Sequence, residues 1–260
     1  MNGELDFAHS LACLELRGGN ELATYRARLP GLSGWISCRP LHAKRGGDLY
    51  YLSSCSRGVV ARVVLADVSG HGEKVSAAAG RLREALLEHV DHWDQSMLIR
   101  RLNDSFLQRA ERAQFATAFL ASFYSGSGEL LFTNAGHMPP LWYRAAQREW
   151  SLMSEATPYR KTIIDLPLGL IPGTAYSQTA VQLEPGDLLL LYTDGINESH
   201  DASGEQLGLG RLLSIARTLP TRSAAAVGKA LVAAVEEFRG PEPQADDETV
   251  LALERLPMVN

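Results

Sequence analysis

Apolar runs and alternating patterns predict that β-strands dominate the middle of the chain. The run over 59–66 is apolar almost throughout and ends at Asp67, which is typical of a buried strand, and the run over 188–192 has the same character. Segments 117–124 and 130–134 are separated by two Ser-Gly pairs, which is the composition of a hairpin turn. The other predicted strands are 34–38, 49–52, 140–143, 148–150, 176–183 and 249–253.

A second periodicity, with apolar residues three and four positions apart, predicts two pairs of helices. The first pair covers about 73–90 and 94–110, and the second covers about 211–219 and 223–238. Blocks of antiparallel strands interrupted by paired helices favour an α+β architecture over a doubly wound βαβ sheet. Because the chain has no internal repeat and no Pro-, Gly- or Ser-rich linker, we expect one domain over 31–256, preceded by a short N-terminal appendage, 1–30.

The composition narrows the class of protein. The chain has 260 residues, 45% of them hydrophobic, which is enough for a large core. Its net charge is −5 and it has no Lys/Arg run, which argues against a nucleic-acid partner. No stretch approaches the roughly 20 apolar residues of a membrane span, and the first residues lack an export signal. Three cysteines without metal spacing indicate reduced thiols, so we expect a cytoplasmic protein.

Aspartates recur at the ends of the predicted strands. Gly46, Gly47 and Asp48 precede one strand, Asp67 ends another, and Asp194 follows a third. Each of these is ordinary turn chemistry when taken alone. A sheet, however, delivers distant residues to one rim, where several carboxylates repel one another unless a cation is present. Hard divalent cations such as Mg²⁺ prefer oxygen ligands, so the pattern predicts a metal site at one rim.

Six short motifs, in order along the chain, carry a resemblance to a known family. They are GGDLY at 46–50, DVSGHG at 67–72, NAGHMPP at 134–140, PLG at 167–169, YTDGINE at 192–198 and DDETV at 246–250. They resemble the successive motifs of the bacterial SpoIIE/RsbU-type serine phosphatases, which are metal-dependent, type 2C-like protein phosphatases. The resemblance runs from about residue 32 to 253. It implies a four-layer α-β-β-α sandwich of two antiparallel sheets flanked by helix pairs.

The resemblance also implies a binuclear Mn²⁺ or Mg²⁺ site and a role for each acid. Asp67 matches the carboxylate that bridges the two metals, and the Val68 carbonyl matches a main-chain oxygen beside the first. Asp194 and Asp246 match ligands of the second metal. Asp48 matches the acid that holds the water shell of that metal.

Further residues have weaker matches in the family. Asp247 is the fallback for Asp246, which is preferred because it occupies the first position of the Asp-Asp-x-Thr motif. Glu198 falls where relatives place an acid for a third, weaker metal, whereas His137 is interpreted as a residue that orders its loop.

Two candidates for catalysis and substrate binding each have a structural alternative. His71 is a candidate general acid that protonates the leaving seryl oxygen, or else only shapes the turn before the helix. Lys44 and Arg45 match an arginine that grips the substrate phosphate in many relatives. The alternative for this basic pair is a solvated position without a role in binding.

The implied reaction is hydrolysis of phosphoserine or phosphothreonine by direct attack of a metal-bridging hydroxide, in which Asp67 and Asp194 serve as catalytic ligands. The implied substrate is a phosphorylated STAS-type anti-sigma-factor antagonist in partner-switching signalling. Because only about 30 residues precede the domain, we expect regulation by a partner protein or a homodimer. The alternatives are a catalytically weak pseudophosphatase that acts as a scaffold, and a hydrolase of small phosphoesters.

Overall fold

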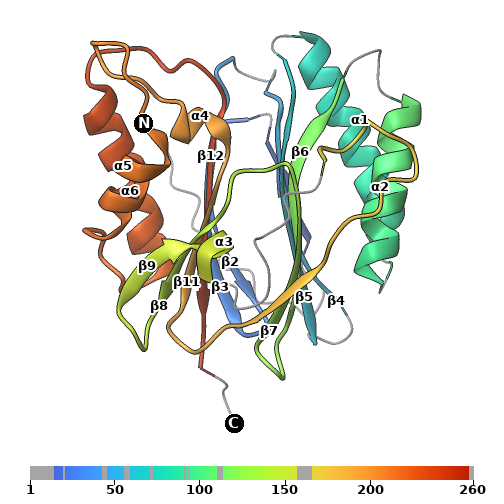
Figure 1. Cartoon of the computed structure of the whole chain (residues 1–260), viewed down its shortest axis with the longest axis horizontal. Coiled ribbons are helices and arrows are strands. Elements are labelled where there is room, and N and C mark those ends of the chain that lie inside the picture. The colour runs from blue at the N-terminus through green and yellow to red at the C-terminus, as the bar shows by residue number, and fades with distance from the viewer. Residues whose placement is uncertain are drawn as a thin grey trace.

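Two antiparallel sheets pack face to face, and a pair of helices covers the outer face of each (Figure 1). This arrangement confirms the predicted α+β sandwich. The computed structural model describes residues 15–19, 21–42, 46–55, 59–70, 73–90, 92, 94–109, 114–156 and 166–257.

The first sheet has the strand order β1-β4-β5-β6-β7-β10. Its central strand β5 is buried along nearly its whole length, because the second sheet covers one face and helices cover the other. This double burial explains the almost uninterrupted apolar run that predicted the strand. The bounds are β1 (Glu15–Gly18), β4 (Asp48–Cys55), β5 (Val60–Val68), β6 (Ala116–Tyr124), β7 (Glu129–Ala135) and β10 (Thr179–Gln182).

The second sheet has the order β2-β3-β12-β11-β8-β9. Residues 15–29, which we expect from the sequence to lie in an N-terminal appendage, supply β1 and β2. Each of these strands forms one of the two edges of its sheet. The β2–β3 hairpin turns at Gly31, whose φ of 70° suits glycine. The bounds are β2 (Ala23–Leu29), β3 (Leu32–Arg39), β8 (Leu141–Arg144), β9 (Glu149–Leu152), β11 (Leu188–Tyr192) and β12 (Glu248–Arg255).

The helices follow the predicted pairs closely. Helices α1 (Glu73–His89) and α2 (Gln95–Arg109) cover the first sheet, and α5 (Gly208–Ala216) and α6 (Ala224–Arg239) cover the second. Two single-turn helices were not predicted: α3 (Met153–Ala156) and α4 (Asp194–Asn197). Among the described residues, no helix is both long and apolar enough to cross a membrane.

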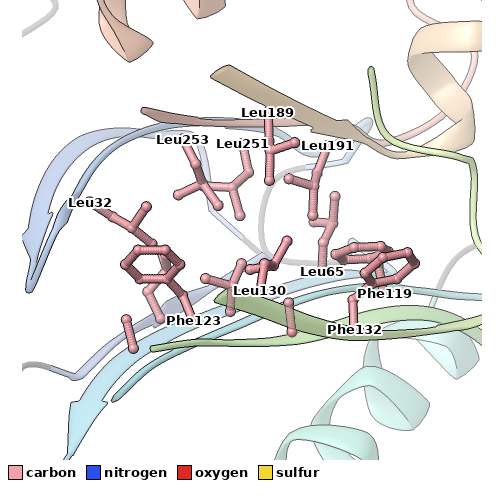
Figure 2. Packing of buried hydrophobic residues seen from close by; sticks show 14 of the residues in the cluster. Leu32, Leu65, Phe119, Phe123, Leu130, Phe132, Leu189, Leu191, Leu251 and Leu253 are labelled. Atoms are coloured by element: carbon pink, nitrogen blue, oxygen red, sulfur yellow. The ribbon is translucent and has the colours of Figure 1, made fainter. Parts of the chain in front are cut away.

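The core between the sheets is made of apolar side chains from both sheets, many of them leucine and phenylalanine. Figure 2 shows Phe119 and Phe132 from the first sheet below Leu191 from the second. The rings of Phe119 and Phe132 stack with their centroids 5.3 Å apart. This core fixes the two sheets against each other, so residues at the ends of their strands have defined neighbours across the sandwich.

Candidate active site

Asp48 and Asp67 face each other as cross-strand partners at one end of the first sheet. Asp48 begins β4 and is fully buried, whereas Asp67 lies near the end of β5 and is half-buried. Burial raises the pKa of Asp48 well above its usual range, and the neighbouring Asp67 charge raises it further. Two carboxyl groups placed directly opposite destabilise the sheet unless another group offsets their charge.

Asp48 is held by two threonine hydroxyls, one directly after β11 and one in β12 of the second sheet. Thr193 donates to Oδ2 over 2.9 Å, and Thr249 donates to the same oxygen over 2.5 Å. Among the described residues, none donates a hydrogen bond to Oδ1, although that atom is also buried. The carboxylate therefore joins the two sheets through one oxygen and keeps the other as an unused acceptor, which is an unusual state for a buried polar atom.

The backbone beside Asp48 passes close to the end of β5. The Val68 amide donates to the carbonyl of Gly47 over 3.3 Å. A Cβ on Gly47 would lie 2.6 Å from Cγ1 of Val75 and 2.9 Å from the carbonyl oxygen of Val68. Glycine at position 47 is therefore required for the chain to approach the Val68 carbonyl at this rim.

Helix α4 brings Asp194 and Glu198 to the same end of the molecule, next to the start of β12 (Figure 1). Asp194 is the first helical residue after Thr193, and Glu198 follows four positions later, so both carboxylates lie on one side of the turn. Burial raises the pKa of Asp194 to about 6, with further contributions from Asp246 and Glu198. The Glu198 side chain is exposed.

The adjacent acids Asp246 and Asp247 have different surroundings. Asp246 is exposed, and its Oδ1 accepts the amide of Asp247 over 2.8 Å. Asp247 is buried, and its two carboxylate oxygens accept the amides of Leu41 and Gly47. Its carbonyl oxygen would lie 2.1 Å from a Cβ on Gly195, so this backbone packs tightly on α4.

The carboxylates at this rim raise one another's pKa values. Burial raises the pKa of Asp67 well above its usual range, and the next contributions come from other acids: Asp194, Asp246, Asp247 and Glu198. Within the described ranges, no three carboxylate, imidazole or thiol groups are positioned to hold a metal ion as they stand. The rim is thus a group of mutually repelling carboxylates rather than a closed coordination sphere.

His137 stands beside this rim as a buried, neutral side chain. Its Nδ1 hydrogen-bonds to Thr117, which is the cross-strand partner of Asp67, over 3.0 Å. The Asn134 side chain bonds to both the amide and the carbonyl of His137, which closes the turn after β7. Burial lowers the pKa of His137 to about 4. These contacts agree with a role in ordering the loop.

Lys44, Arg45 and His71 lie outside the described residues, so their predicted roles stay predictions. The other predicted site residues, by contrast, all belong to strand ends or turns at this one rim: Asp48, Asp67, Val68, Asp194, Glu198 and Asp246. The two threonines that hold Asp48, Thr193 and Thr249, were not predicted as site residues. Their positions directly beside motif acids were the only indication of such a role in the sequence.

A family model and a curated relative match the chain. The model of "Stage II sporulation protein E (SpoIIE)" matches residues 58–256. Phosphoserine phosphatase RsbU of Bacillus subtilis is 25% identical over 161 residues, which are 61% of this chain and 44% of RsbU. The chain spans less than half the length of the curated relatives that it matches.

Solved structures share the fold. The structure of the RsbU and RsbW domains of Rv1364c from Mycobacterium tuberculosis superposes with a TM-score of 0.77 at 22% identity, over 93% of this chain and 64% of that chain. The structure of RsbX in complex with magnesium superposes with a TM-score of 0.64 at 13% identity, over 89% of this chain and 99% of RsbX. Because the family model covers more than half of its residues, the chain belongs to the SpoIIE family. Its two-sheet sandwich is the fold of the PP2C-type phosphatase domains, such as the PP2C domain of SiaA from Pseudomonas aeruginosa, which superposes with a TM-score of 0.70 at 21% identity over 86% of this chain and 85% of that chain.

Proposed function

We propose that this chain is a divalent-metal-dependent protein phosphatase that acts on phosphoserine and phosphothreonine. The observation that carries the proposal is Oδ1 of Asp48, a buried carboxylate oxygen without a donor among the described residues, opposite Asp67. A carboxylate cluster of this kind is stabilised by a hard cation, which accepts several oxygen ligands and neutralises their repulsion. Membership of the SpoIIE family and the similarity to phosphoserine phosphatase RsbU support the same activity.

The residues at the rim fit Mn²⁺ or Mg²⁺. Asp67, Asp194 and Asp246 would hold two ions through their carboxylates, the Val68 carbonyl would contribute a main-chain oxygen, and Asp48 would hold metal-bound water. Such a pair of ions supplies Lewis acidity for the phosphoryl oxygens and a water of lowered pKa. Because the acids are not in ligating positions as they stand, we infer that binding draws their side chains inward.

The chain itself prepares Asp48 for this role. The hydroxyls of Thr193 and Thr249 donate to one oxygen and favour the ionised form, which opposes the effect of burial on its pKa. They also hold the carboxylate in one orientation, since Thr249 lies in β12 and Thr193 is fixed beside it by a backbone hydrogen bond to Thr249. Orientation by a surrounding hydrogen-bond shell is the usual way in which proteins fix the groups around a metal.

The finer assignments rest on the sequence motifs. We propose that His71 protonates the leaving seryl oxygen, that Lys44 and Arg45 grip the substrate phosphate, and that Glu198 supports a third, weaker ion. Alanine at both Lys44 and Arg45 should raise KM for a phosphoprotein substrate. Unchanged kinetics would identify the pair as solvated surface residues.

We propose a phosphorylated STAS-type anti-sigma-factor antagonist as the substrate and a partner-switching pathway as the setting. The similarity to RsbU, and the presence of an RsbW domain beside an RsbU domain in the Rv1364c structure, support this choice. We also infer that activity is controlled by a partner protein or by formation of a homodimer.

One assay tests the function against its alternatives. Phosphate release is measured from a chromogenic aryl phosphate and from a phosphorylated STAS protein, each with Mn²⁺, with Mg²⁺ and with a chelator. The proposal expects metal-dependent release from both substrates. Release from the aryl phosphate alone identifies a hydrolase of small phosphoesters, and no release under any condition identifies a scaffold.

A further inference from the structure

Asp247 binds two backbone amides that are six residues apart in the chain. Its Oδ1 accepts the Leu41 amide over 2.7 Å, and its Oδ2 accepts the Gly47 amide over 2.5 Å. The Asp247 side chain is buried, and its hydrogen bond with Gly47 is buried as well, whereas the one with Leu41 is partly buried. A single carboxylate on the loop before β12 therefore fixes both ends of the segment that leads into β4 and Asp48.

Glycines make this contact possible. A Cβ on Gly46 would lie 3.0 Å from Oδ2 of Asp247, and a Cβ on Gly47 would lie 2.9 Å from the carbonyl oxygen of Val68. The backbone of Gly46 and Gly47 thus runs between Asp247 and the end of β5 without space for side chains. Because Asp48 follows directly, its position opposite Asp67 depends on how this segment is held.

Asp247 differs from Asp246 in what its carboxylate does. Asp246 is exposed, and its charge raises the pKa of Asp67 more than the charge of Asp247 does. Both oxygens of Asp247, in contrast, already accept backbone hydrogen bonds. A metal bound to Asp247 would have to share or replace those bonds.

We propose that Asp247 is a positioning residue, which seats Asp48 opposite Asp67 by holding the backbone amides of Leu41 and Gly47, and that it is not a metal ligand. The structural part of this proposal concerns the protein without metal. Its catalytic consequence rests on the proposed phosphatase function.

The variant Asp247→Asn tests these two hydrogen bonds directly. The asparagine amide nitrogen cannot accept a hydrogen bond, so one of the two backbone amides loses its acceptor. Hydrogen exchange of the Leu41 and Gly47 amides, followed by NMR in metal-free protein, should become about tenfold faster at one or both positions. Unchanged exchange at both amides would overturn the proposal.

Metal titration separates positioning from ligation. By calorimetry, Asp247→Asn should bind as many Mn²⁺ ions as the parent, whereas Asp246→Asn should bind one fewer. At saturating Mn²⁺, Asp247→Asn should lose kcat by about 10–100-fold, as for other residues that orient metal ligands, with KM changed by less than about threefold. Loss of one bound ion from Asp247→Asn would identify it as a ligand and overturn the proposal.

The control is another buried aspartate that holds backbone, at the opposite end of the sandwich. Asp187 accepts the amides of Ala145 and Glu184 over 2.8 and 3.1 Å, and the indole N–H of Trp142 over 3.1 Å. Asp187→Asn should lower the melting temperature without a change in kcat. An equal loss of kcat in both variants would mean that Asp247→Asn acts by general destabilisation, and it would overturn the positioning role.

Two further outcomes keep the proposals separate. If the parent binds no Mn²⁺ and releases no phosphate, the phosphatase function fails, while the exchange experiment still decides whether Asp247 holds the two amides. If Asp247→Asn does not fold, the same measurements on Asp247→Ser decide the question, since its hydroxyl retains one acceptor for the backbone amides.

Discussion

Aspartates stand near both ends of strand β11, but the surroundings of their carboxylates differ. At the start of the strand, both carboxylate oxygens of Asp187 are used by backbone and indole donors. Beyond the other end, Asp194 stands near Asp67 and Asp246, and one oxygen of the nearby Asp48 has no donor among the described residues. A buried acid whose oxygens are all satisfied stabilises the fold, whereas unsatisfied, clustered acids impose a cost that a functional ligand can offset.

The strongest test of this comparison replaces one acid at each end. Asp67→Asn should lower kcat/KM by about 10³-fold, because loss of a metal ligand removes several kcal/mol of transition-state stabilisation. Asp187→Asn should leave kcat/KM within about threefold and lower only stability, as expected for a buried hydrogen-bonded group. Steady-state kinetics and thermal unfolding measure both. Full activity in Asp67→Asn would refute the site.

A second pair of variants removes one hydrogen-bond donor at each end. Thr249→Val deprives Asp48 of one hydroxyl and should cost about 1–3 kcal/mol of stability and about 10–100-fold in activity. Trp142→Phe deprives Asp187 of its indole donor and should cost a similar free energy of unfolding with unchanged activity. Denaturant unfolding and phosphate release provide the two readouts. Equal activities in the two variants would show that the hydroxyl of Thr249 has no functional role.

Metal binding should stabilise the folded state, and this gain should depend on the acids at one end of the sandwich only. At Mn²⁺ concentrations 100-fold above its dissociation constant, the folded state gains about 2.7 kcal/mol, which corresponds to a rise in Tm of roughly 5–10 °C. Asp194→Asn should abolish most of this rise, and Asp187→Asn should keep it. Differential scanning calorimetry with and without Mn²⁺ measures the shift, and an unchanged Tm in the parent would contradict metal binding.

The last prediction concerns acid stability and His137, and it leaves activity at neutral pH unchanged. Because burial lowers the pKa of His137 to about 4, the unfolded chain binds a proton below pH 6.5 that the folded chain does not. The contribution of His137 to stability is therefore complete above pH 6.5 and is lost as the pH drops towards 4, by up to about 3 kcal/mol. His137→Gln should flatten this slope in urea titrations. A substitution at exposed His42 is the control, and an equal slope in parent and His137→Gln would contradict the prediction.

Most elements could be predicted because their patterns are local. The apolar run of β5 and the three- and four-residue spacing of α1 reflect burial along a single element, which the sequence displays directly. Strand β2 was not predicted, because residues 23–29 are only partly buried at a sheet edge and their pattern is weak. Helix α4 was also not predicted, since one turn is too short for helical periodicity to appear.

The candidate site, too, was predictable only as far as local patterns reach. The residue types of the motif acids and their order along the chain were enough to indicate divalent-metal chemistry. Asp48 and Asp194 stand beside glycine, Asp67 ends an apolar run, and Asp246 belongs to an acidic pair. The surroundings of each acid could not be inferred in this way. Asp246 and Asp247 are adjacent and chemically identical, yet one is exposed and the other is buried against the amides of Leu41 and Gly47.

By itself, the sequence determined the architecture, the family and which carboxylates form the candidate site, because these follow from periodicity and short motifs. Only the tertiary structure decided which hydrogen-bond partners each acid has and how far it is buried. Asp48 is joined to Thr193 and Thr249 by hydrogen bonds that span 145 and 201 positions of the chain. Such partners are chosen by the packing of one sheet on the other, and no local pattern encodes a contact over that separation.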